Sequence, residues 1–167
     1  MIILLNGPLG VGKSTLAEVL MESIDGCVML DGDSIVAVNP PPADEPRYLN
    51  ATLTLLVAHH QRAGYRHFVI DHLWTSAHGL DALRAQLAAV APGQPIHAFL
   101  LTLSLEDNLR RIRARQAARA IDEREFEWQT VMAERALLEG RSDVGEPLEV
   151  TAAPEEVAAA IRARLGL

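Results

Sequence analysis

The sequence predicts an α/β fold, a doubly wound five-stranded parallel sheet with helices on both faces. Three observations predict it. Short apolar runs alternate along the chain with longer segments of helical periodicity. Each run is apolar at most positions, as in strands that are buried on both faces. A glycine-rich turn and a helix follow the first run directly, which is how a βα unit begins.

We expect each element in turn from its local pattern. The N-terminal run IILLN is the first strand, and the segment after Gly12 has helical spacing. Prolines at 40, 41, 42 and 46 exclude a helix across 39–46, so the next long helix is expected from Arg47. The expected strands are 2–6, 27–30, 67–71, 96–102 and 148–151, and the expected helices are 13–23, 47–63, 78–90, 105–115, 123–138 and 154–165.

Length and charge narrow the classes of function. The chain of 167 residues fits a single domain, 1–167, and contains no internal repeat or linker. A net charge of −7 argues against nucleic acid as a partner but leaves free nucleotides open, since these need only a local site. Cys27 is the only cysteine, and the apolar run at 2–5 is too short for a signal peptide or membrane span. We therefore expect a cytoplasmic protein with no membrane partner and leave its oligomeric state open.

The most specific motif follows the first strand. The sequence GPLGVGKS at 7–14 matches G-x-x-x-x-G-K-[ST], the P-loop or Walker A pattern. Its backbone N–H groups converge on phosphate oxygens, and the helix that follows adds its positive end. Lys13 is the only lysine, beside fourteen arginines, because a compact ammonium fits between phosphates where a planar guanidinium does not. The expected nucleotide-binding residues are Gly7, Pro8, Leu9, Gly10, Val11, Gly12, Lys13, Ser14 and Thr15.

Two alternatives compete with an ATP site. A glycine-rich turn can merely join a strand to a helix, but then neither the matching spacing nor the position of the sole lysine is explained. A GTPase is disfavoured, because a chain whose only lysine is Lys13 has no N-K-x-D motif to read guanine.

With these residues, the chain resembles small P-loop kinases of the shikimate, gluconate and nucleotide kinase type, including chloramphenicol phosphotransferase and zeta-toxin-like proteins. The resemblance rests on the loop, on Asp31-Gly32-Asp33 after the second strand, on Asp71 after the third, and on the arginines that follow the fourth. It implies ATP and Mg²⁺ as cofactors, a nucleotide and a small molecule as partners, and phosphorylation of a hydroxyl.

Three acidic residues are candidates for the chemistry. In extended backbone, Asp31 and Asp33 point the same way at a strand's carboxyl end, where they would face the γ-phosphate and the substrate. Asp33 is the favoured catalytic base; the alternative is that Asp33 or Ser34 caps a helix starting at Ile35. Asp71 is expected to orient Mg²⁺ together with the Ser14 hydroxyl, or else to serve as a turn or cap.

The two residues near Asp71 in sequence are less informative. His72 and Trp74 follow it directly, and either contact with substrate or packing fits them.

The arginine-rich stretch suggests a lid. Arg111, Arg115 and Arg119 recur every four residues and share a face of a continuous helix. A solvated face with surface pairs, such as Asp107 with Arg111, is the alternative. By the resemblance, a lid-like segment near 115–124 delivers Arg115 and Arg119 to the transferring phosphate.

Position alone assigns the substrate and adenine regions. In the resembling kinases, the insertion after the second strand, here near 35–63, contacts the substrate, so Arg47 is expected to bind an anionic group or else to be a surface charge. Adenine is expected near 151–154.

The expected function is thus an ATP-dependent phosphotransferase acting on a small-molecule hydroxyl. The alternative is an ATP-binding regulatory or interaction module without such activity.

Overall fold

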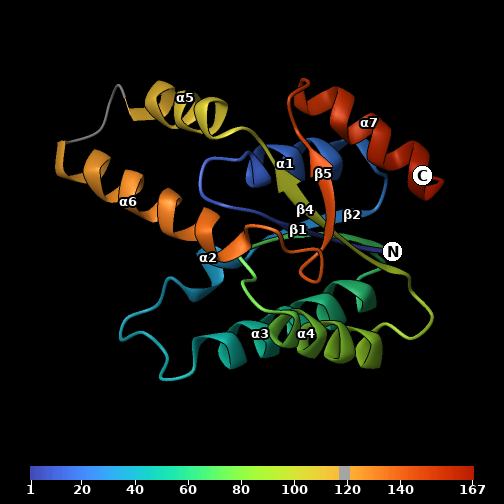
Figure 1. The fold of residues 1–167 in the computed structure, drawn as a ribbon. Coiled ribbons are helices and arrows are strands. Elements are labelled where there is room, and N and C mark those ends of the chain that lie inside the picture. Colours follow the sequence, from blue (N-terminus) through green and yellow to red (C-terminus); the bar gives the residue numbers. More distant parts are fainter. Residues whose placement is uncertain (117–120) are drawn as a thin grey trace.

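A computed structural model of the chain describes residues 1–116 and 121–167. Five parallel strands form one sheet in the order β2-β3-β1-β4-β5, and helices cover both faces (Figure 1). The elements in chain order are β1 (Ile2–Asn6), α1 (Lys13–Ser23), β2 (Cys27–Asp31), α2 (Gly32–Val36), α3 (Glu45–Arg62), β3 (His67–Asp71), α4 (Ala77–Val90), β4 (Ile96–Thr102), α5 (Leu105–Gln116), α6 (Ile121–Leu138), β5 (Glu146–Glu149) and α7 (Pro154–Leu165). The predicted fold class is confirmed.

The central strand divides two hydrophobic cores. Ile3 and Leu5 of β1 pack toward α1 and α7, whereas Ile2 and Leu4 pack toward α3 and α4. All four side chains are at most 2% exposed. Because successive side chains of a strand point to opposite faces, a run that is apolar at every position can fill both cores.

Several boundaries differ from the sequence prediction by a few residues, and three of these differences have a clear physical reason. Strand β5 spans Glu146–Glu149 rather than 148–151, because an edge strand paired only with β4 does not need apolar residues at each position. Helix α3 begins at Glu45, since Pro46 is tolerated in the first turn, where its missing N–H has no partner to lose. The short helix α2 begins at Gly32, not at Ile35.

The topology places the P-loop at the centre of the sheet's carboxyl edge. Strand β1 lies between β3 and β4, so the loop after β1 has the ends of both neighbouring strands beside it. Ligands of doubly wound sheets bind at this edge. Among the described helices, none is long and apolar enough to cross a membrane.

Candidate functional site

The P-loop turns back through two glycines in left-handed conformation. Gly10 has φ of 78° and Gly12 has φ of 107°, values that side-chain-bearing residues rarely adopt. Gly12 immediately precedes Lys13, the first residue of α1, so the loop leads straight into the helix N-terminus. The arrangement is the anion-binding loop that the motif predicts.

Lys13 lies at the centre of the loop's electrostatics. Its Nζ donates to the carbonyl of Gly7 at 2.8 Å and to that of Pro8 at 3.4 Å. Burial lowers the pKa of Lys13, while the carboxylates of Asp33, Glu134, Asp71 and Asp31 act in the opposite direction. The ammonium is therefore held by loop carbonyls inside an acidic environment.

Ser14 and Asp71 come together as the sequence predicts. The Ser14 hydroxyl donates to Asp71 Oδ2 at 2.8 Å, which joins the start of α1 to the end of β3. Asp71 is only 2% exposed, and its Oδ1 has no hydrogen-bond partner. Burial raises the pKa of Asp71, and the nearby Asp31 and Asp33 raise it further. A carboxylate oxygen without a partner beside a hydroxyl fits Mg²⁺, a hard cation that takes oxygen ligands.

The protein would supply only part of a metal site. Among the described residues, no group of three or more His, Cys, Asp or Glu could hold a metal ion. Mg²⁺ commonly binds through one or two protein groups together with phosphate oxygens and water, so the Ser14–Asp71 pair is sufficient for that mode.

The two aspartates after β2 differ from the extended arrangement expected from sequence. Asp31 caps α2: its Oδ1 accepts from the backbone N–H groups of Asp33 and Ser34, at 2.9 and 3.3 Å. The predicted cap, Asp33 or Ser34, is wrong by two or three positions, because a helix that starts at Gly32 places its N-cap at Asp31. Asp33 lies inside the helix, and its carboxylate is free of the capping role.

The Asp33 carboxylate instead forms a hydrogen bond with His72, the residue after Asp71. His72 Nδ1 lies 2.8 Å from Asp33 Oδ1. This hydrogen bond lowers the pKa of Asp33 against the opposing effect of partial burial, and Lys13 also lowers it. The ring of His72 stacks edge-on against Trp74, with centroids 5.5 Å apart. The sequence left open whether His72 and Trp74 contact substrate or only pack. In the structure His72 contacts both Asp33 and Trp74.

A cavity of about 430 Å³ joins the loop to the end of the sheet. Asp33 and Arg115 line it together with the P-loop residues from Leu9 onward. At its other end lie Val150, Ala152 and Pro154, which are at or beside the positions expected for adenine.

The arginines of α5 separate into different roles. Arg111 does not pair with Asp107; its two Nη atoms donate to the carbonyls of Val11 and Val150, each at 2.7 Å. Arg110 forms the surface pair with Asp107 instead, at 2.5 Å. Arg115 lines the cavity, and the prediction for Arg119 lies outside the described residues.

Arg47 is exposed in the first turn of α3 and does not line this cavity.

Two further residues, Glu134 and Asn108, contact the loop, although no sequence motif identifies them. The backbone N–H of Leu9 donates to Glu134 Oε2 at 2.5 Å, and the Leu9 carbonyl accepts from Asn108 Nδ2 at 3.0 Å. Burial raises the pKa of Glu134. Both contacts span about a hundred residues of sequence, so the local patterns of the sequence could not reveal them.

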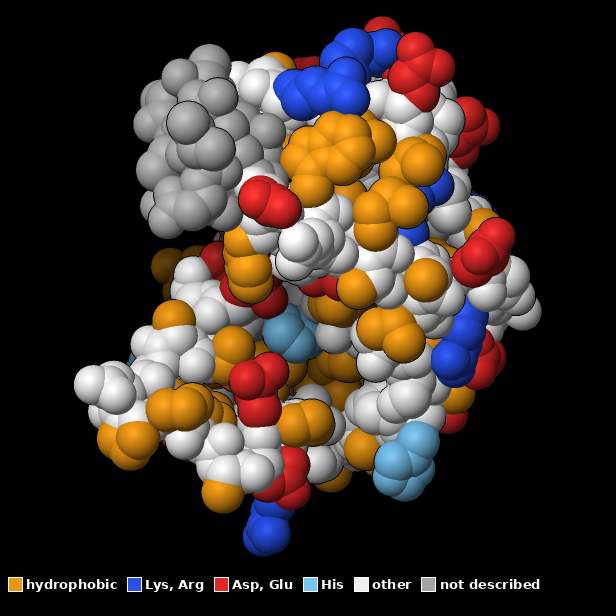
Figure 2. Space-filling model, turned by 60° about the vertical axis from the view of Figure 1, so that its left-hand side comes forward, with side chains coloured by type: hydrophobic (Ala, Val, Ile, Leu, Met, Phe, Trp, Pro, Cys, Tyr) orange, Lys and Arg blue, Asp and Glu red, His pale blue; other side chains and the backbone are white. Residues whose placement is uncertain are grey.

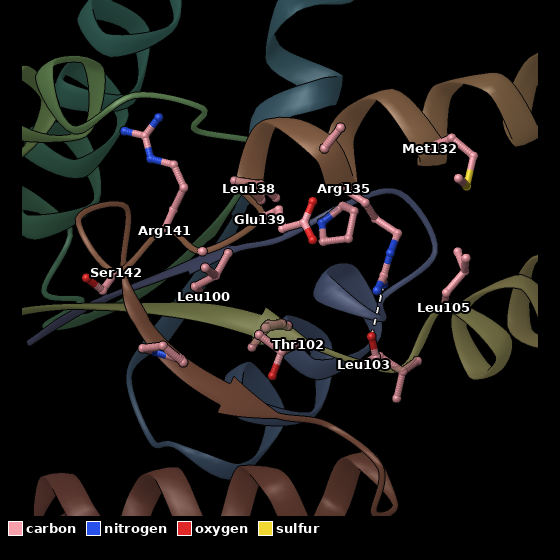
Figure 3. A pocket seen from close by; sticks show the side chains of 15 residues that line it. Leu100, Thr102, Leu103, Leu105, Met132, Arg135, Leu138, Glu139, Arg141 and Ser142 are labelled. Carbon is pink, nitrogen blue, oxygen red and sulfur yellow. Dashed lines mark hydrogen bonds between the residues drawn. The ribbon is translucent and has the colours of Figure 1, made fainter.

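A second cavity of about 700 Å³ lies between the C-terminal part of α6 and β4 (Figure 3). Leucines of β4 form its floor, and Arg135 and Glu139 lie near the end of α6. Leu105 and Met132 line it and are 38% and 47% exposed. Figure 2 shows hydrophobic side chains gathered on one face of the molecule, with acidic side chains bordering a hollow beside them.

The fold and the loop define the class of protein: a P-loop domain with a kinase-like fold. The family model described as AAA domain matches residues 2–139, so the chain belongs to that family. A search among curated proteins gives no match.

Several solved structures have the same fold, and two of the three described here carry kinase names. The tunicamycin resistance protein of Deinococcus radiodurans has a TM-score of 0.70 at 20% identity, over 99% of this chain and 95% of that one. A gluconokinase from Sinorhizobium meliloti 1021 has a TM-score of 0.64 at 19% identity, over 98% and 91%. Shikimate kinase from Aquifex aeolicus vf5 has a TM-score of 0.62 at 16% identity, over 99% and 96%. The resemblance to P-loop small-molecule kinases is confirmed, and at these identities the likeness establishes the fold.

Proposed function

We propose that this protein is an ATP- and Mg²⁺-dependent phosphotransferase that phosphorylates a hydroxyl of a small molecule. One observation carries the proposal: the carboxylate of Asp33, held by His72, lines the same cavity as Lys13 and the P-loop. A phosphate-binding loop alone fits any nucleotide-binding module. An oriented carboxylate that faces that loop, and that a lowered pKa favours in its ionised form, is able to accept a hydroxyl proton.

In the proposed reaction, the acceptor oxygen bonds to the γ-phosphorus as the bond between that phosphorus and the β–γ bridging oxygen breaks. The hydroxyl proton passes to Asp33, and ADP carries away the bridging oxygen. Lys13 leaves the Gly7 and Pro8 carbonyls to contact the β- and γ-phosphates. Ser14 and Asp71 would hold Mg²⁺, which would neutralise phosphate charge there. Arg115 stabilises the charge that develops on the transferred group.

The remaining expected residues and segments extend the proposal. Asp31 fixes α2, so it supports Asp33, and from the carboxyl end of β2 it is proposed to contribute to substrate binding. In the same proposal, Arg47 of the substrate segment 35–63 binds an anionic group of the acceptor, and Arg119 of the lid-like segment 115–124 acts on the transferring phosphate. The whole chain, 1–167, works as one domain.

The test is incubation of the protein with ATP and Mg²⁺ and a panel of sugars, sugar acids, shikimate-like acids, nucleosides and antibiotics. A phosphorylated product identified by mass spectrometry supports the proposal. Tight ATP binding without product from any acceptor favours the alternative, an ATP-binding regulatory or interaction module.

Two variants separate these functions. A kinase loses transfer in both Lys13→Ala and Asp33→Asn, with Asp33→Asn retaining ATP binding and losing about 10²- to 10⁴-fold in turnover. A binding module loses its biological effect only in Lys13→Ala. Circular dichroism should show an intact fold in both variants.

A further inference from the structure

Side chains of α5 and α6 hold the backbone of the P-loop from outside. Leu9 is held at both polar groups, its N–H by Glu134 at 2.5 Å and its carbonyl by Asn108 at 3.0 Å. Two residues further on, the carbonyl of Val11 accepts from Arg111. Within the loop itself, Val11 N–H donates to the Pro8 carbonyl at a longer 3.3 Å. Each of these contacts from outside the loop is shorter than that internal backbone bond.

The two contacts at Leu9 belong to one network. Asn108 is fully buried, and its Oδ1 accepts from Arg135 Nη1 at 3.3 Å. The same Nη1 donates to the Leu103 carbonyl at 2.9 Å, the bond drawn in Figure 3. Because Glu134 and Arg135 are neighbours on α6, that helix reaches the Leu9 N–H directly and the Leu9 carbonyl through Asn108.

The loop has a physical need for such contacts. Gly10 and Gly12 allow the left-handed conformation but do not fix it, because glycine has the largest backbone freedom to lose. The helix α5 also lies against the loop: a Cβ on Gly10 would stand 2.5 Å from Ile112 Cγ1. A loop that is already ordered before the ligand binds loses less conformational entropy on binding. The nucleotide therefore binds more tightly.

We propose that Glu134 and Asn108 are positioning residues that clamp Leu9 and preorganise the P-loop for phosphate. Neither residue needs to touch the nucleotide in this role. The effect on nucleotide affinity rests on the proposed function, whereas the effect on the mobility of the loop does not.

The experiment compares Glu134→Ala, Glu134→Gln and Asn108→Ala with the matched control Glu125→Ala, an exposed glutamate of the same helix. Amide hydrogen exchange at Leu9 is measured by NMR on the nucleotide-free protein. Mg·ATP affinity is measured by calorimetry and thermal stability by circular dichroism.

Loss of a hydrogen bond to a charged acceptor should speed Leu9 exchange and weaken Mg·ATP binding by about tenfold in Glu134→Ala. Glu134→Gln keeps an acceptor oxygen and should recover most of that loss. Asn108→Ala should also speed Leu9 exchange, and Glu125→Ala should match the wild type in all three measurements.

Two results would overturn the clamp: Leu9 exchange unchanged in Glu134→Ala, or equal losses in Glu134→Gln and Glu134→Ala. If wild-type protein binds no nucleotide, the proposed function fails, while the exchange measurement still decides whether the clamp exists.

Discussion

Asn6 offers the sharpest test of how the carboxyl edge of the sheet is held together. This fully buried residue at the end of β1 makes four hydrogen bonds. Its Oδ1 accepts from the N–H groups of Gly7 and Trp74, at 2.8 and 2.9 Å. Its Nδ2 donates to the carbonyls of Trp74 and Val144, at 2.8 and 2.9 Å. One carboxamide thus joins the P-loop, the loop after β3 and the loop before β5.

Asn6→Ala removes all four bonds and leaves four backbone groups buried without partners. At about 1 kcal/mol for each bond, the free energy of unfolding should fall by about 4 kcal/mol. That is a large share of the ~5–15 kcal/mol that typically stabilises a domain. For a chain of this size it corresponds to a fall in Tm of roughly 8–16 °C.

The assay is urea unfolding followed by circular dichroism, with Gln129→Ala as the control, an exposed carboxamide on α6. Asn6→Asp adds a pH test. The introduced carboxylate keeps an acceptor for both N–H groups but faces two carbonyl oxygens, so its pKa in the folded state should be raised. The folded state then binds more protons than the unfolded chain, and stability should fall as pH rises through this range. A loss below about 1 kcal/mol in Asn6→Ala would refute the reasoning, because it would mean that water replaces the four bonds.

Three further predictions concern the site. Asp31→Ala should lower the free energy of unfolding by about 1–2 kcal/mol in urea titration, because α2 loses its N-cap. Asp71→Asn should raise stability at pH 7, since the raised pKa of Asp71 means that its ionised form costs folding free energy there, while calorimetry should show weaker Mg²⁺-dependent ATP binding. Arg115→Ala should lower kcat by about 10- to 10³-fold, whereas Arg110→Ala, which breaks only a surface pair, should leave kcat unchanged.

The fold could be predicted largely from sequence because its signals are local. The central strand is apolar at successive positions, and the loop that follows it has fixed spacing, so neither depends on distant residues. Strand β5 was misplaced by two residues because its edge position relaxes the apolar pattern. The N-cap at Asp31 was missed because the sequence DGD suits both an extended backbone and a helix start.

The candidate site was only partly predictable for a related reason. Ser14 and Asp71 follow parallel strands that are neighbours in the sheet, so topology alone brings them together. Asn108 and Glu134 reach Leu9 across 99 and 125 residues, and the sites of such contacts depend on how α5 and α6 pack. Periodicity showed that these helices exist but gave no sign of which polar side chain turns toward the loop.

The surroundings of Lys13 help to explain why this position holds a lysine in a chain whose other basic residues are fourteen arginines. Burial lowers its pKa, and the four nearby carboxylates counter that effect. Its Nζ donates to the Gly7 carbonyl at 2.8 Å, within a loop whose Gly10 and Gly12 have positive φ. A guanidinium would need room for a planar fork of five donors, as Arg111 has where it spans the Val11 and Val150 carbonyls. The shapes of the two basic side chains therefore suit different positions. The compact ammonium of Lys13 binds inside the loop, and the planar guanidinium of Arg111 holds the loop from outside.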